Sequence, residues 1–238
     1  MNKINYQKEL EKILEKYSGK EWAEKDVHKQ EAAKRGESSI PERSQPPRLF
    51  LHSCCAPCSS YCLEYLCQYF AITVFYYNPN ISMEEEYRKR VAEQKRLIAA
   101  YNEEQRGYPI LVVEGDYQPE LFFEMAKGYE DCPEGGERCF KCFDLRLRRT
   151  AEEAKAGGFD YFATTLTISP LKNADKINEI GGLLASEYGV SWLPSDFKKK
   201  NGYKRSIELS AEYDLYRQDY CGCAFSKAER EKVNHKIQ

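Results

Sequence analysis

The sequence predicts an α/β protein: a Rossmann-like, three-layer domain in which helices cover both faces of a mostly parallel sheet of about five strands. Apolar segments of strand length alternate with helical segments along most of the chain, and this alternation is typical of a parallel sheet. The 238 residues suffice to bury one sizeable core. Residues 1–47 differ in composition, so we divide the chain into an N-terminal charged extension, 1–47, and an α/β domain, 48–238.

The extension is predicted to be partly helical or flexible. Leu10, Ile13, Leu14 and Tyr17 recur at helical spacing in YQKELEKILEKY, which favours a short amphipathic helix. The segment that follows is polar, mixed in charge and ends in two prolines, a composition typical of weakly ordered chain. The extension contains no residues that indicate chemistry.

The domain is expected to contain strands and helices in alternation. The strands are expected within the apolar segments 48–53, 71–80, 108–117, 159–169 and 190–197. The helices are expected at 60–70, 82–104, 119–129, 143–158, 173–189 and 206–216. Sites in such sheets gather at the carboxyl ends of the strands. Because the first cysteine motif and the motifs NPN, EGDY and TISP each follow a strand, we expect them to lie together at one edge.

Charge and hydropathy narrow the choice of compartment and partners. The formal net charge of −2 gives no overall attraction to DNA or to a membrane surface, so contact with nucleic acid would need a local basic patch. No apolar run approaches the roughly 20 residues of a spanning helix, and the N-terminus lacks the apolar stretch of a signal peptide. We therefore expect a cytoplasmic protein. In that reducing compartment its ten cysteines indicate metal binding or catalysis, not structural disulfides.

Seven of the cysteines form three groups. Each group is expected in a loop beside glycine or proline: Cys54-Cys55-x-x-Cys58, Cys139-x-x-Cys142 and Cys221-x-Cys223. Of the remaining three, Cys62 and Cys67 fall on a predicted helix and are expected to be buried, inert thiols, and Cys132 has no clustered partner.

The chemistry of these thiols leaves several readings open. Adjacent residues in extended chain point in opposite directions, which disfavours one tetrahedral zinc ion at Cys54 and Cys55 and favours the wider iron–sulfur cluster. Structural zinc and a dithiol enzyme without metal remain alternatives. Cys221 and Cys223 are close enough in sequence to form only a strained disulfide, which suits a redox couple; further metal ligands are the other reading.

Eight motifs within residues 48–228 carry a specific resemblance. They are LHSCCAPCSSY, FYYNPNI, EEEYRKR, EGDY, GGERCFKCFDLRL, TTLTISPLKN, GYKRSIELS and YRQDYCGCAFS. Together they resemble the cobalamin-independent epoxyqueuosine reductase family, whose members remove the epoxide oxygen of epoxyqueuosine at the wobble position of tRNA. The extension lies outside the resemblance.

The resemblance implies an enzyme, an oxidoreductase with an iron–sulfur cofactor. By the family pattern, a [4Fe-4S] cluster would be held by Cys54, Cys55, Cys139 and Cys142. Cys221 and Cys223 would form the redox-active disulfide. The family also implies an additional mononuclear iron, for which Cys58 and Asp116 are the candidate ligands. An external electron donor and tRNA carrying epoxyqueuosine are the implied partners.

Proton transfer and substrate binding require further residues. The acid that protonates the leaving oxygen is sought in Asp116, Tyr77 and Lys172. Arginine and lysine contact phosphate and aromatic rings stack on an extruded base, and DFKKKNGYKRS is the best basic patch in the domain. The candidate substrate-binding residues are Tyr77, Asn78, Tyr87, Arg90, Lys172 and Arg205.

Three other functions are compatible with parts of the sequence. CFKC and CGC suggest a metal-free thiol–disulfide oxidoreductase, although such an enzyme needs a single C-x-x-C. The cysteine count allows a zinc-bearing tRNA-binding module. An ATP-dependent nucleotide-modifying enzyme would carry a phosphate loop after the first strand, where this chain has CCAPCSS.

Overall fold

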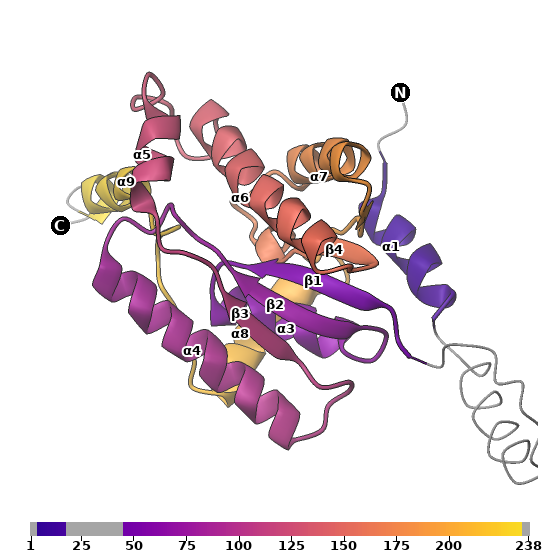
Figure 1. Ribbon diagram of the computed structural model, residues 1–238. Helices are drawn as coiled ribbons and strands as arrows, with labels where there is room; N and C mark the ends of the chain where they lie inside the picture. The colour runs from indigo at the N-terminus through magenta and orange to yellow at the C-terminus, as the bar shows by residue number, and fades with distance from the viewer. Residues whose placement is uncertain (1–3, 18–44, 235–238) are drawn as a thin grey trace, which may run out of the picture.

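The computed structural model describes residues 4–17 and 45–234 and shows a five-stranded parallel sheet with helices on both faces (Figure 1). The strands are β1 (Arg48–Ser53), β2 (Ala71–Tyr76), β3 (Leu111–Glu114), β4 (Tyr161–Thr164) and β5 (Ser191–Trp192). They lie in the order β3-β2-β1-β4-β5, and every neighbouring pair is parallel. The predicted fold class is confirmed. The order of the strands reverses between β1 and β4, and such a switch point is where α/β sheets bind ligands.

Helices cover the two faces of the sheet unequally. They are α1 (Tyr6–Glu15), α3 (Ala56–Leu66), α4 (Glu84–Glu103), α5 (Pro119–Ala126), α6 (Glu137–Ala156), the 3₁₀-helix η1 (Thr165–Ile168), α7 (Ala174–Tyr188), α8 (Gly202–Glu212) and α9 (Ala224–Asn234). In Figure 1, α6 and α7 lie on one face, and α3, α4 and α8 lie on the other. No helix in the described part of the chain is long and apolar enough to cross a membrane.

The core has one half on each face of β1. Leu49 and Leu51 pack toward α3 with Val74 of β2, whereas Phe50 packs toward α6 with Phe162 of β4. All five of these residues are buried. A central parallel strand is buried on both faces, which explains why its sequence is continuously apolar and does not alternate.

Helix α1 belongs to the folded domain. Leu10 and Leu14 are buried in the same core half as α3, and the hydroxyl of Tyr17 lies 3.0 Å from that of Tyr161 on β4. The predicted amphipathic helix is thus confirmed, and its apolar residues have a packing role. The remainder of the extension, 18–44, lies outside the described residues.

Several element boundaries differ from the prediction. Helix α6 begins at Glu137, six residues before the predicted start, because its first two turns carry cysteines and charges that apolar spacing does not reveal. The segment 159–169 divides into β4 and η1, since the Thr164 hydroxyl accepts a hydrogen bond from the Leu166 amide and turns the chain. Helix α9, directly after Cys223, was not predicted.

Candidate active site

The seven clustered cysteines lie at the beginnings of three helices. Cys55 is the N-cap residue of α3, Cys139 and Cys142 occupy the first two turns of α6, and Cys223 immediately precedes α9. The predicted loop location is wrong for Cys58, Cys139 and Cys142, which are helical. Helix N-termini carry partial positive charge, and they favour the thiolate that binds metals or reacts.

The first group of cysteines converges on one point. The Sγ atoms of Cys54 and Cys55 are 3.8 Å apart, and with that of Cys58 all three sulfurs lie within 4.8 Å of one another, close enough to hold a metal ion. The expectation that adjacent cysteines point in opposite directions is wrong here, because the chain passes from strand into helix at Cys55.

Cys54 is the member of this group that ionises first. The thiols of Cys55 and Cys58 donate toward its sulfur, which holds the pKa of Cys54 well below its ordinary value, and Lys172 acts in the same direction. The pKa of Cys55 rises to about 12, chiefly because its thiol donates a hydrogen bond to the sulfur of Cys54. Cys54 is therefore the most acidic thiol of the three.

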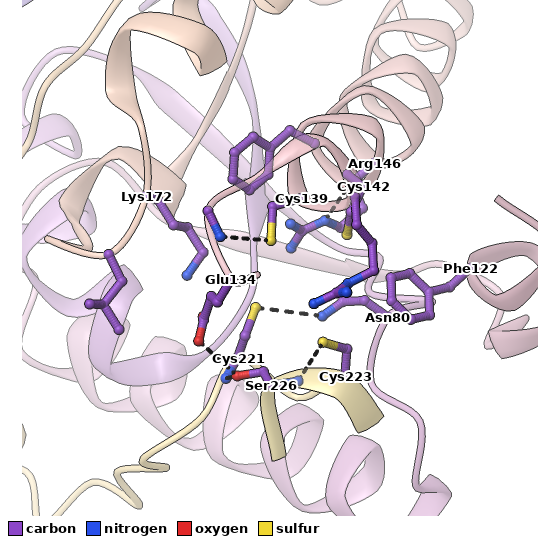
Figure 2. A pocket seen from close by; sticks show the side chains of 14 residues that line it. Asn80, Phe122, Glu134, Cys139, Cys142, Arg146, Lys172, Cys221, Cys223 and Ser226 are labelled. Atoms are coloured by element: carbon purple, nitrogen blue, oxygen red, sulfur yellow. Dashed lines mark hydrogen bonds between the residues drawn. The ribbon is translucent and has the colours of Figure 1, made fainter. Parts of the chain in front are cut away.

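The other four cysteines line a narrow hollow together with Arg146 and Lys172 (Figure 2). Backbone amides approach two of them: Gly135 N lies 3.2 Å from the Sγ of Cys139, and Ser226 N lies 3.3 Å from that of Cys223. The carboxamide of Asn80 donates to the Sγ of Cys221 at 3.9 Å. Burial raises the pKa of the Cys142 thiol to about 11.

Two cavities adjoin at this edge of the sheet. The narrow hollow measures about 20 Å³, whereas the larger cavity measures about 590 Å³ and is lined by Cys54, Cys55 and Cys58. Lys172 and Cys221 line both. Thiols that are distant in the chain therefore open onto neighbouring spaces. Of the motifs expected to meet at this edge, the first cysteine motif and TISP line the larger cavity, whereas Asp116 of EGDY lines neither.

The loop with Cys221 and Cys223 is held in place by backbone geometry and by a buried arginine. Gly222 has φ +116°, and a Cβ there would lie 2.9 Å from Ile81 and 3.2 Å from the guanidinium of Arg90. Arg90 is buried, donates to the Cys221 carbonyl at 3.1 Å and pairs with Glu86 at 2.6 Å. Both cysteines are free thiols.

His52 ties together the strand ends beneath the site. Its Nε2 lies 3.0 Å from the carbonyl of Tyr77, and its Nδ1 lies 2.8 Å from the hydroxyl of Thr164. Because a carbonyl only accepts, Nε2 carries the proton and Nδ1 accepts from the hydroxyl. Burial lowers the pKa of His52 to about 3, so the ring is a neutral link between β1, β2 and β4.

Three of the candidate substrate-binding residues are parts of the framework. Tyr77 is buried, and its ring stacks on Phe75 with centroids 5.6 Å apart. Asn78 donates to the carbonyl of Ser53 at 2.8 Å, and Tyr87 donates to that of Gly115 at 3.2 Å. These residues line neither cavity.

Lys172, Asp116 and Arg205 have different surroundings. Lys172 faces both cavities; burial disfavours its charge, but the thiols of Cys221 and Cys54 outweigh burial and raise its pKa. Asp116 is exposed after β3 and lines neither cavity. Arg205 of α8 donates to Glu64 of α3 at 2.7 and 3.0 Å and also lines neither cavity. Of these three, only Lys172 adjoins the cysteines.

Two arginines and a tyrosine at the larger cavity were not among the predicted residues. Arg217 donates to the hydroxyl of Ser210 at 2.9 Å, and Arg230 of α9 donates to the backbone carbonyl of Asp219 at 2.9 Å. Tyr220 lines the same cavity. The motif YRQDYCGC could have indicated Arg217 and Tyr220, since both lie within four residues before Cys221.

Arg146 was also missed. It lies four residues after Cys142 and seven after Cys139 on α6, and this spacing places all three on one helix face. Its sequence context, RLRR at residues 146–149, gave no hint of burial, because an arginine-rich helix is usually a solvated surface. A helix beginning at Glu137 instead of 143 would have revealed the alignment.

Comparisons with known proteins show the family to which this chain is similar. A model of the family "Epoxyqueuosine reductase QueH" matches residues 49–229. The protein of that name from Streptococcus pyogenes serotype M1 is 46% identical over 185 residues, which are 78% of this chain and 72% of the relative. The Staphylococcus epidermidis protein is 42% identical over 94% of this chain and 85% of its own length. The Thermotoga maritima protein is 36% identical over 79% and 95%.

The family model covers nearly the whole α/β domain, and the residues that it matches include all seven clustered cysteines. The predicted resemblance is confirmed. Because the family is named as a reductase, the comparisons favour an enzyme over a non-catalytic zinc module. The chain belongs to the epoxyqueuosine reductase QueH family and is an oxidoreductase of that kind.

Proposed function

We propose that this protein reduces epoxyqueuosine to queuosine at the wobble position of tRNA, using a [4Fe-4S] cluster and the Cys221/Cys223 dithiol. One observation carries the proposal: thiols from three separate segments open onto two adjoining cavities beyond the carboxyl ends of the strands. The family name supports the reaction. The ten free thiols support a reducing, cytoplasmic setting.

The donor set fits an iron–sulfur cluster. Thiolates are the usual ligands of such clusters, and the buried guanidinium of Arg146 has unmet N–H donors beside the thiols. In the proposal Cys54, Cys55, Cys139 and Cys142 hold the cluster. The sulfur of Cys58 lies within 4.8 Å of two of these sulfurs, and Cys58 is the proposed ligand of an additional mononuclear iron. Asp116 is a weaker candidate for a second ligand of that iron, because it is exposed and lines neither cavity.

The dithiol balances the reaction. Loss of the epoxide oxygen breaks two C–O bonds, forms a C=C bond and consumes two electrons and two protons, with water as the second product. Oxidation of the Cys221 and Cys223 thiols to a disulfide releases two electrons and two protons. When bound, the cluster supplies one-electron transfer between them. An external electron donor then reduces the disulfide for the next turnover.

Lys172 is the proposed proton donor. Its ammonium group faces both cavities, next to Cys221 and Cys54. Tyr77 is committed to the core and Asp116 is exposed, so neither competes well for this role. A cation beside the leaving oxygen also stabilises the negative charge that develops there.

The larger cavity is the proposed site of the modified nucleoside. About 590 Å³ is within the range of ligand pockets. Arg217 and Arg230 keep N–H donors for backbone phosphates, and Tyr203 and Tyr220 in the same lining offer rings for stacking. The predicted basic patch contributes less, since Lys198 and Lys200 are paired with Asp196 and Glu11.

Cysteine variants test this assignment. We expect Cys54→Ala and Cys139→Ala to lose both the brown colour and all turnover of epoxyqueuosine-tRNA, since each removes a cluster ligand. Cys221→Ala should keep the colour and lose turnover. Cys132→Ala is the matched control, because Cys132 lines neither cavity, and it should resemble the wild type in both measurements. Full activity of Cys221→Ala would refute the dithiol's role.

A further inference from the structure

Arg146 is a buried cation whose hydrogen-bonding capacity is mostly unused. Its side chain is 1% exposed, and its Nε donates to the carbonyl of Cys142 at 3.1 Å. Both terminal nitrogens, Nη1 and Nη2, are buried and have no hydrogen-bond partner among the described residues. Four N–H groups are therefore held inside the protein with nothing described to receive them.

The other buried arginines near the site each have a carboxylate beside them. Arg90 pairs with Glu86 at 2.6 Å. Arg138 donates to two backbone carbonyls at 2.8 and 3.0 Å and reaches Glu229 at 3.4 Å. An unpaired buried charge is strongly unfavourable. Because Arg90 and Arg138 have carboxylate partners and Arg146 has none described, we expect an anionic group to bind Arg146 in the hollow that it lines.

Four sulfurs line the same hollow as this guanidinium, together with Glu134 and Lys172. Arg146 lines the hollow with Cys139, Cys142, Cys221 and Cys223 (Figure 2). Burial disfavours its charge, yet the thiols of Cys142, Cys221, Cys54 and Cys139 raise its pKa. Thiols from all three cysteine groups thus interact electrostatically with this cation. A single thiolate could not accept hydrogen bonds from all four of its free N–H groups.

We propose that Arg146 sets the reduction potential of the iron–sulfur cluster by donating hydrogen bonds to its sulfurs and by balancing its negative charge. The inference rests on the function proposed above. Adding one electron to a thiolate-bound cluster adds one negative charge, and a fixed cation beside it stabilises that reduced state. Hydrogen bonds to cluster sulfurs and to thiolates act in the same direction. Arg146 therefore raises the potential.

A redox titration of the anaerobically purified protein tests this role. Dithionite, the reductant, supplies one electron for each cluster reduced, and the reduced fraction is followed by electron paramagnetic resonance against solution potential. The variants are Arg146→Met, which keeps most of the volume and removes the charge, and Arg146→Lys, which keeps the charge and removes the planar fork. Arg148→Met is the control, because Arg148 lies on the same helix and pairs with Asp144 and Glu187 at the surface.

At the potential where the wild-type cluster is half reduced, we expect the ratio of reduced to oxidised cluster in Arg146→Met to fall at least tenfold. For a one-electron couple this is a shift of about 59 mV. Arg146→Lys should show a smaller fall, and Arg148→Met should match the wild type. If Arg146→Met does not fold, the comparison of Arg146→Lys with Arg148→Met decides, and equal potentials for these two overturn the inference.

The outcomes separate this inference from the proposed function. A wild-type protein that binds cluster, together with Arg146 variants of unchanged potential and normal iron content, overturns the role of Arg146 and leaves the function intact. A wild-type protein without iron and sulfide overturns the proposed cofactor, and the inference with it.

Discussion

At the scale of single residues, Gly222 decides how the backbone turns between Cys221 and Cys223. Its φ of +116° is accessible to glycine and strained for every other residue. Its missing side chain leaves room for Ile81 and for the guanidinium of Arg90, which in turn binds the Cys221 carbonyl. The glycine therefore positions the thiols through both the backbone and a neighbouring arginine.

We expect Gly222→Ala to lower the free energy of unfolding and to reduce turnover. Positive φ costs a non-glycine residue about 1–3 kcal/mol, and contact with Ile81 and Arg90 adds to this. Gly128→Ala is the matched control, since Gly128 has φ +78° and open space around its Cα. Urea denaturation should show a clearly larger loss for Gly222→Ala, with turnover reduced only there. Equal losses with normal turnover would contradict a positioning role.

The residues of the site were predictable only in part. The grouping of seven cysteines is visible in the sequence because spacing alone defines it. The sequence did not show which polar residues reach the site: Asp116 and Arg205 belong to the motifs EGDY and GYKRSIELS, but they line neither cavity. Arg146 does line one, and its sequence neighbours gave no sign of burial. Side-chain direction depends on packing that spacing does not encode.

At the scale of elements, the helix N-termini organise the site. Three helices begin at the cysteine groups, so the positive ends of their dipoles meet where thiolates are needed. The beginning of α6 was misplaced by six residues because helix prediction followed apolar spacing, whereas Cys139 and Cys142 are themselves the inward-facing residues there. Cysteines stand at the start of α6 where apolar residues would usually mark the buried face, so apolar spacing missed the first six residues of the helix.

Helix α1 is an element whose importance a family match would not reveal. It lies before the matched residues 49–229, yet Leu10 is 0% exposed in the main core. We expect Leu10→Ala to lower the free energy of unfolding by about 2–5 kcal/mol, because it leaves a cavity. The control is Ile4→Ala, since Ile4 is exposed and should change the value by less than about 0.5 kcal/mol. Matching urea transitions for both variants would show that α1 contributes nothing to the core.

At the scale of the whole molecule, the order of the strands explains why distant segments meet. The chain places β1 at the centre, turns outward through β2 and β3, and returns to the other side of β1 with β4. The loops after β1 and β4 therefore adjoin, and they bring Cys54 and Lys172 to the same cavity. The strict alternation of apolar and helical segments made this convergence predictable. Helix α9 closes the site from the far end of the chain, and nothing in the alternation required it.

Our central claim is that these converging thiols hold one iron–sulfur cluster. The most direct test is chemical analysis of the protein purified without oxygen, with its visible absorption spectrum. The account predicts a brown protein with about four iron and about four acid-labile sulfide per chain, both lost in Cys54→Ala. A colourless protein that contains zinc, or no metal, and still reduces epoxyqueuosine-tRNA would contradict it.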